Sequence, residues 1–266
     1  VNDGTEDSES DTVQITVQDT IAPAITVSSV GPIEATGPET PADIAASASA
    51  ADLVGVDSFS ASNNGPFAVG TTAVIWTAMD AAGNTSTATQ NVTIDDTTAP
   101  VVTATDRTVE ATGPSTPVDV SGDASATDAV GVTSLTNDSP GSFPANATTQ
   151  VNWTASDAAG NTSDAVQNIT IQDTIAPVLT APADVTVDAT GTLTPVDLGT
   201  PTATDAVGVV TLTNDAPAAG FPVDSTTTVT WTAKDAAGNT TIDTQIVTIR
   251  PFVLGVTTGK TKLKIH

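Results

Sequence analysis

Short stretches of alternating apolar and polar residues recur along the chain. "TTQVNWTAS" (148–156) and "VQNITIQ" (166–172) show the alternation most clearly. A period of two is typical of a β-strand that buries one face, whereas no stretch keeps the 3.6-residue period of an amphipathic helix. Gly, Pro, Asn and Asp interrupt these stretches about every ten residues, as in antiparallel sandwiches. The pattern predicts an all-β protein with almost no helix.

The same phrase occurs three times, around the three tryptophans. Trp76 lies in "VIWTAMDAAGNTS", Trp153 in "VNWTASDAAGNTS" and Trp231 in "VTWTAKDAAGNTT", with 77 and then 78 residues between successive tryptophans. Such a period indicates tandem structural units. We predict three modules, called here module 1 (residues 19–95), module 2 (96–172) and module 3 (173–250), flanked by residues 1–18 and 251–266.

Each module has the strand spacing of an antiparallel β-sandwich. Since a strand of eight to ten residues spans roughly 30 Å, three sandwiches joined end to end would form an elongated rod of about 100 Å. We expect the tryptophans to be core residues, because each lies on the penultimate strand of its module. The phenylalanines that recur in phase are expected in the core as well, namely Phe67, Phe143 and Phe221.

The repeated landmarks resemble a known family. "DT-x-A-P", "V-E-A-T-G-P", "A-T-D-x-V-G-V" and "W-T-A-x-D-A-A-G-N-T" follow one another as in the hyalin repeat (HYR) module. This resemblance covers residues 20–250 and implies an immunoglobulin-like fold with a general association with cell adhesion. Many animal members carry a cysteine where Trp153 and its equivalents stand, but this chain has no cysteine, so we expect the indole to fill that space.

The two flanks differ from the modules. "VNDGTEDSESDTVQITV" (1–17) resembles the end of a PKD-type module, so residues 1–18 are predicted to be the terminal strand of an upstream immunoglobulin-like module. The alternative is a donor strand that inserts into the sheet edge of a neighbouring subunit. Each module has a closing strand of its own, which argues against such a vacancy. Residues 251–266 are predicted to begin a downstream segment.

The charge is strongly one-sided, with 31 acidic residues against 6 basic ones and a net charge of −25. Such a chain repels nucleic acid and attracts cations. Lys260, Lys262 and Lys264 lie near the C-terminus, so head-to-tail docking onto the acidic body of another copy is an alternative way to form filaments. No apolar run approaches the roughly 18 residues of a membrane helix, and we expect no membrane insertion in this region.

Aspartates recur at three landmarks of each module. In an immunoglobulin-like sandwich the start of the first strand, the B–C loop and the F–G turn lie at one pole, which would gather three carboxylates per module. Calcium prefers such oxygen ligands, whereas the alternative is that these aspartates only satisfy turn geometry. The predicted metal ligands are Asp19, Asp52 and Asp80 in module 1, Asp96, Asp128 and Asp157 in module 2, and Asp173, Asp205 and Asp235 in module 3.

Two classes of function follow from these observations. The first is structural: an acidic extracellular or cell-surface array of spacer modules in a surface protein, sheath, S-layer or fibre, stiffened by calcium at its joints. Its partners would be other copies or flanking modules of the same polypeptide. The second is an adhesin whose modules bind a surface glycan or protein. The sequence lacks a Ser-His-Asp set, a phosphate loop and a metal-hydrolase motif, so we do not expect an enzyme.

Overall fold

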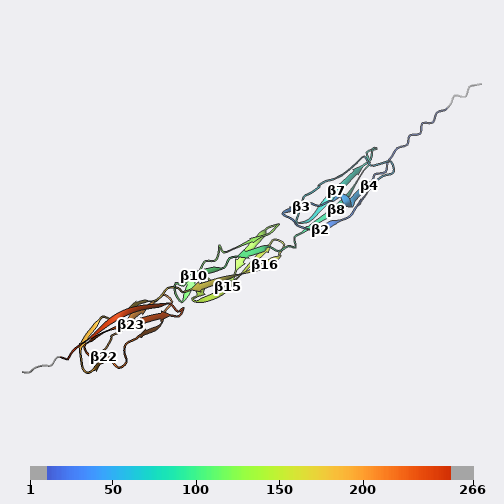
Figure 1. Cartoon of the computed structure of the whole chain (residues 1–266). Coiled ribbons are helices and arrows are strands. Elements are labelled where there is room, and N and C mark those ends of the chain that lie inside the picture. Colours follow the sequence, from blue (N-terminus) through green and yellow to red (C-terminus); the bar gives the residue numbers. More distant parts are fainter. Residues whose placement is uncertain (1–10, 253–266) are drawn as a thin grey trace, which may run out of the picture. The chain divides into compact units, whose positions relative to one another are not determined.

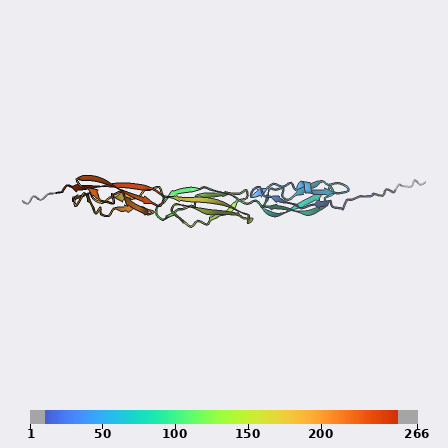
Figure 2. The ribbon, with the colours of Figure 1, turned by 60° about the horizontal axis from the view of Figure 1, so that its bottom comes forward.

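The computed structural model describes residues 11–252, and these residues form an all-β protein, as predicted. The only helical element in this range is a single 3₁₀ turn, Ala45–Ser47, and no helix there is long and apolar enough to cross a membrane. The predicted docking of Lys260, Lys262 and Lys264 falls outside the described residues. Figures 1 and 2 show β-strands along the described part of the chain, coloured from blue at its start to red at its end.

The strands of module 1 form one four-stranded sheet and two short pairs. The sheet has the order β2-β8-β7-β5, and the pairs are β1-β4 and β3-β6. The strand bounds are β1 (Ala24–Val27), β2 (Val30–Glu34), β3 (Glu39–Thr40), β4 (Ala48–Ala51), β5 (Ser58–Ala61), β6 (Phe67–Ala68), β7 (Gly70–Met79) and β8 (Thr85–Asp95).

Modules 2 and 3 repeat this arrangement. Their four-stranded sheets have the orders β10-β16-β15-β13 and β18-β24-β23-β21. The strands of module 2 are β9 (Val101–Ala104), β10 (Arg107–Glu110), β11 (Ser115–Pro117), β12 (Ala124–Thr127), β13 (Val132–Asn137), β14 (Ser142–Pro144), β15 (Ala147–Asp157) and β16 (Thr162–Gln172). Those of module 3 are β17 (Val178–Thr180), β18 (Val185–Asp188), β19 (Leu193–Thr194), β20 (Thr202–Thr204), β21 (Val209–Asn214), β22 (Phe221–Pro222), β23 (Ser225–Asp235) and β24 (Thr240–Arg250).

The described residues fall into two compact units, and the boundary runs through module 2. One unit contains residues 11–102, 126–135 and 154–163, and the other contains residues 103–125, 136–153 and 164–252. The predicted module bounds therefore remain predictions, and so does the rod.

The first part of each module switches between sheets. In module 1, β1 pairs antiparallel with β4, and the chain then continues into β2, which pairs parallel with the closing strand β8. The closing strand thus has neighbours on both sides, β2 and β7. The same holds for β16 and β24 in modules 2 and 3, so within the described residues each closing position is already filled by the module's own strand.

The hairpin of the last two strands supplies most of the core. Along β7 the inward positions Val74, Trp76 and Ala78 are buried, and outward residues alternate with them. Trp153 and Trp231 are buried in the same way, as are the three phenylalanines in phase with them. The predicted core roles of these aromatic residues are confirmed. Burial of such large side chains gives each small sandwich much of its stability.

Each tryptophan is paired with a glutamine that the sequence analysis did not single out. The indole Nε1–H of Trp76 donates to Oε1 of Gln90 at 2.8 Å, and Nε2 of Gln90 donates to the backbone carbonyl of Ser28 at 2.8 Å. Gln167 and Gln245 form the same two kinds of contact in modules 2 and 3. The indole N–H and the glutamine amide in each core therefore have hydrogen-bond partners, as buried polar groups require.

Candidate metal centres

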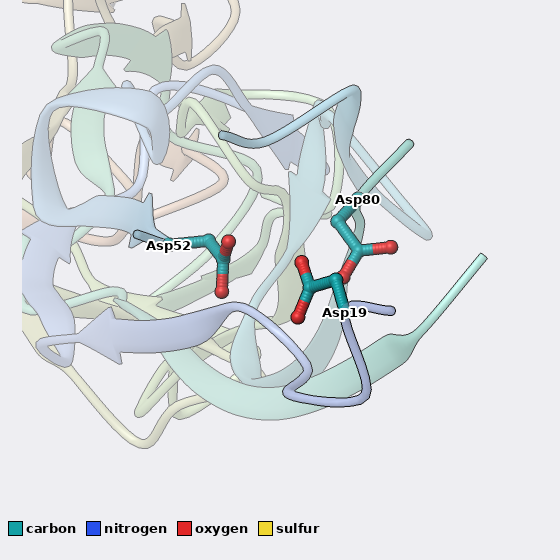
Figure 3. A group of neighbouring side chains, drawn as sticks. All are labelled: Asp19, Asp52 and Asp80. Atoms are coloured by element: carbon teal, nitrogen blue, oxygen red, sulfur yellow. The ribbon is translucent and has the colours of Figure 1, made fainter. Parts of the chain in front are cut away.

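Three segments converge at one pole of each module. They are the segment before the first strand, the loop that follows β4, β12 or β20, and the turn of the last hairpin. Figure 3 shows the carboxylates of Asp19, Asp52 and Asp80 facing one another from these segments. In each module, one carboxylate oxygen from each of the three aspartates lies within 4.8 Å of the others. The structure therefore brings together all nine predicted ligands in the predicted groups of three.

The turn aspartate is held rigidly by its own hairpin. Oδ1 of Asp157 accepts hydrogen bonds from the backbone N–H groups of Gly160 (2.8 Å) and Asn161 (2.9 Å). Gly160 has a φ of +94°, a left-handed conformation that glycine adopts without strain. Burial raises the pKa of Asp157, but the hydrogen bonds from Asn161 and from the turn N–H groups outweigh it, and the pKa lies below its ordinary value. The turn role and a ligand role are compatible.

The loop aspartate shapes the loop that carries it. Oδ1 of Asp128 accepts hydrogen bonds from the N–H groups of Val130 (2.8 Å) and Gly131 (2.9 Å). Asp52 and Asp205 make the equivalent pair of bonds in modules 1 and 3. Asx turns of this kind fix the side-chain direction. The loop therefore points its carboxylate toward the pole before any ligand arrives.

The leading aspartate has a buried oxygen atom without a partner. Asp96 and Asp173 are only 8% and 4% exposed. Oδ2 of Asp19, of Asp96 and of Asp173 is buried and makes no hydrogen bond. A buried carboxylate oxygen without a partner is costly, and its repeated occurrence calls for an explanation.

The pKa values of two leading aspartates reflect this environment. Burial raises the pKa of Asp96, and the negative charges of Asp157 and Asp128 raise it further. Burial likewise raises the pKa of Asp173. A positive ion at the pole would reverse both effects, because it compensates for lost hydration and neutralises neighbouring charge.

An asparagine side chain connects two segments of each pole. Nδ2 of Asn161 donates to Oδ2 of Asp157 at 2.8 Å and to the backbone carbonyl of Asp96 at 3.0 Å. Asn84 and Asn239 make the same bridges in modules 1 and 3. The asparagine positions two segments of the pole relative to each other. The recurrence of this asparagine in every "DAAGN" phrase could have indicated a shared role. The carbonyl that accepts its hydrogen bond could not be recognised from the phrase, because it lies 65 residues earlier in the chain.

A glutamate of the preceding module also reaches this region. Oε1 and Oε2 of Glu34, at the end of β2, accept hydrogen bonds from the N–H (3.0 Å) and the hydroxyl (2.6 Å) of Thr97, the residue after Asp96. Glu110 at the end of β10 holds Thr174 in the same way, next to Asp173. These contacts connect the sheet of one module to the pole of the next.

The donors at each pole suit a hard cation. The three side chains offer carboxylate oxygens only, and these are the ligands that Ca²⁺ prefers, at six to eight per ion. Zinc and copper sites commonly use nitrogen or sulfur ligands, which these groups of three do not offer. The geometry is therefore compatible with a divalent ion that is bound by oxygen atoms.

Comparisons with known proteins identify the type of module. Residues 172–249 match the family model of the HYR domain. Hyalin from Strongylocentrotus purpuratus is 35% identical over 222 residues, which are 73% of this chain and 18% of hyalin. This chain thus spans about a fifth of the length of that relative.

Similar solved structures include an extracellular domain of protocadherin GammaB4 and Sidekick-1 immunoglobulin domains 1–5. The first is 13% identical with a TM-score of 0.32, covering 89% of this chain and 51% of that one. The second is 10% identical with a TM-score of 0.32, covering 85% of this chain and 61% of that one. On the family match and the identity with hyalin, this chain is built from HYR-type modules.

Proposed function

We propose that this chain is a spacer segment of an extracellular, adhesion-type repeat protein and that each aspartate pole binds one Ca²⁺ ion. The observation that carries the calcium assignment is the buried, unpartnered Oδ2 of Asp19, Asp96 and Asp173, each beside two further carboxylates. The extracellular, adhesive setting follows from the HYR-type modules. We assign no catalytic role to the poles, because a constellation repeated in every module is better explained as structural.

Calcium fits the poles better than magnesium does. The three carboxylates come from three separate segments, and one oxygen from each lies up to 4.8 Å from the others. Ca²⁺ accepts such variable geometry, whereas Mg²⁺ requires a near-ideal octahedron and retains its water. Sites in extracellular modules commonly have dissociation constants of about 10⁻⁴ to 10⁻³ M. We expect affinities in that range here.

An ion at the pole of module 2 would also stabilise the joint with module 1. Asp96 precedes Thr97, and Glu34 of module 1 fixes Thr97 through two hydrogen bonds. Neutralising the pole removes repulsion between the carboxylates and fixes the leading segment, the loop and the turn together. The predicted consequence is a stiffer joint, which supports the role of the modules as spacers.

The test is a calorimetric titration of the chain with CaCl₂, with thermal melts in calcium and in excess chelator at constant ionic strength. We expect three sites and a melting temperature that rises by several degrees with calcium. Asp96→Asn keeps the shape of the side chain and should remove one site. Asp57→Asn, at an exposed aspartate outside the poles, is the matched control and should keep three. No heat of binding and identical melts would contradict the proposal.

Small-angle X-ray scattering tests the spacer role separately. A rod of about 100 Å with stiff joints gives a maximum dimension that decreases when chelator loosens the joints. An unchanged, short maximum dimension in both conditions would contradict the spacer role without bearing on calcium binding.

A further inference from the structure

The loop of module 2 sits on the end of module 1. Val130, in the "TDAVGV" loop, packs against the hydrophobic core of module 1. Beside it, Gly37 of module 1 is buried, and a Cβ atom at this position would lie 3.9 Å from the carbonyl oxygen of Ala129. At the next joint, Gly113 of module 2 is also buried, and a Cβ atom at this position would lie 3.8 Å from the carbonyl oxygen of Ala206 in module 3. Each of these loops therefore rests on the preceding module.

The equivalent loop of module 1 is exposed and more apolar. Leu53 and Val54 occupy the positions of Ala129 and Val130, yet they are 98% and 72% exposed. At the joints, Val130 and Val207 are half-buried, whereas Ala129 and Ala206, at the position of Leu53, are exposed. Val54 is therefore the residue whose exposure distinguishes the loop of module 1 from the two loops at the joints.

The segment that leads into module 1 has the register of a closing strand. Val13, Ile15 and Val17 are 81%, 82% and 92% exposed. They lie six, four and two residues before Asp19, at the offsets that separate three inward residues of β8 from Asp96, which are Gln90, Val92 and Ile94. Those three residues are at most 1% exposed. The alternation of residues 12–18 therefore matches the buried face of a closing strand.

We infer that residues 12–18 close a further immunoglobulin-like sandwich and that Val54 packs against the end of this sandwich, as Val130 packs against the core of module 1. The arrangement continues the joints described above, in which a closing strand leads directly into the leading aspartate. Asn84 already fixes Asp19 for this geometry, since Nδ2 of Asn84 donates to the carbonyl of Asp19 at 3.2 Å. The inference does not depend on calcium.

The register also indicates what kind of sandwich this is. At the position of Gln90 and Gln167, which accept the indole N–H of their tryptophans, the leading segment has Val13. A valine cannot accept this hydrogen bond, and a buried indole N–H without a partner is costly. The partner is therefore an immunoglobulin-like module that lacks the Trp–Gln pair of the three modules described here.

Two extended chains test this inference. In the first, residues 96–164 of module 2 are placed directly before residue 11, so that residues 11–18 replace 165–172 as the closing strand. The second carries residues 96–172 directly before Asp19 and serves as the folding control. Hydrogen exchange of residues 12–18 and hydroxyl-radical footprinting of Leu53 and Val54 are measured in calcium and in chelator.

We expect protection of residues 12–18 in the first chain and a several-fold lower footprinting rate at Val54 in both, whereas Leu53 should stay reactive, because Ala129 at the equivalent position is exposed. Val13→Gln should stabilise the first chain, because it restores the partner of the added tryptophan, but should leave the original chain unchanged. If the control folds and residues 12–18 stay unprotected even with Val13→Gln, the closing-strand assignment is wrong. If the control folds and Val54 reacts as fast as in the original chain, the assignment of Val54 to the docking surface is wrong.

Discussion

Glu34 and Thr97 are 63 residues apart in sequence, yet both carboxylate oxygens of Glu34 accept hydrogen bonds from Thr97, at 3.0 and 2.6 Å. Thr98 donates a third bond to Oε1 of Glu34 at 2.7 Å. These bonds hold the pKa of Glu34 below its ordinary value, with the Thr97 and Thr98 hydroxyls as the largest causes. The joint between modules 1 and 2 is therefore fixed by a charged acceptor with three donors.

Replacing Glu34 by Gln should weaken this joint. The amide loses the charge and one acceptor, so the Thr97 contacts weaken, and we expect the melting temperature of the full chain to fall by a few degrees. Glu110→Gln should do the same at the next joint. The control is Asp188→Asn in module 3, where the equivalent carboxylate makes only an exposed ion pair with Arg250, which contributes little. Equal melts for Glu34→Gln and Asp188→Asn would argue against the joint contact.

The Trp–Gln pair should be important for the stability of each module. Gln90→Leu leaves the indole N–H of Trp76 without a partner inside the core, and it removes the amide donor of the partly buried Ser28 carbonyl. At about 1–3 kcal/mol for a buried unpaired group, the free energy of unfolding should fall by about 1–3 kcal/mol. Urea unfolding measures this change, and Thr89→Val on the exposed face of the same strand is the control. A loss below 0.5 kcal/mol, the ordinary range for surface substitutions, would show that the pair is dispensable.

Two aspartates should have opposite effects on stability as the pH changes in chelator. The pKa of Asp138 is lowered by the side-chain and backbone N–H groups of Asn152, so its contribution is present above the ordinary aspartate pKa and is lost as the pH falls through the folded value. The pKa of Asp96 is raised, so its ionised form is destabilising at neutral pH, and acidification relieves this.

Thermal melts from pH 7 to pH 3 in chelator test the predicted direction of the pH effect for both aspartates. Relative to the parent chain, Asp138→Asn should melt lower at pH 7 and Asp96→Asn should melt higher, and both differences should shrink toward pH 3. If Asp96→Asn melts lower than the parent at pH 7 in chelator, the leading aspartate is not destabilising as described.

Asn161 should affect calcium binding without being a ligand. Its side chain bridges Asp157 and the carbonyl of Asp96, so Asn161→Ala frees two segments of the pole. Loss of such an orienting contact commonly reduces metal affinity 10- to 100-fold. We expect a reduction of this size at one site of three by calorimetry. Asn91→Ala, at an exposed asparagine on β8, should leave all three affinities unchanged.

The sequence predicted the all-β fold and the grouping of the nine aspartates, because both follow from local signals repeated in phase. Strand alternation marks the hairpins, and the poles of an immunoglobulin-like sandwich determine which loops meet. The contacts of Glu34 and Asn161 were missed, because they depend on where a strand ends relative to a segment more than 60 residues away. The exposure of Val54 was not predicted either, since the residue stands in the same phrase as the half-buried Val130 and differs in what covers it.

The parallel pairing of β2 with β8 has a mechanical consequence. β2 lies near the start of module 1 and β8 ends it, and residues Val30, Ile33 and Glu34 are paired with Val92, Ile94 and Asp95. A pull on the two ends of the module in opposite directions would slide these strands along each other, loading their hydrogen bonds together in shear instead of opening them one by one. The pairings of β10 with β16 and of β18 with β24 repeat this geometry, so we expect each module to resist extension through the parallel pairing of its second strand with its closing strand.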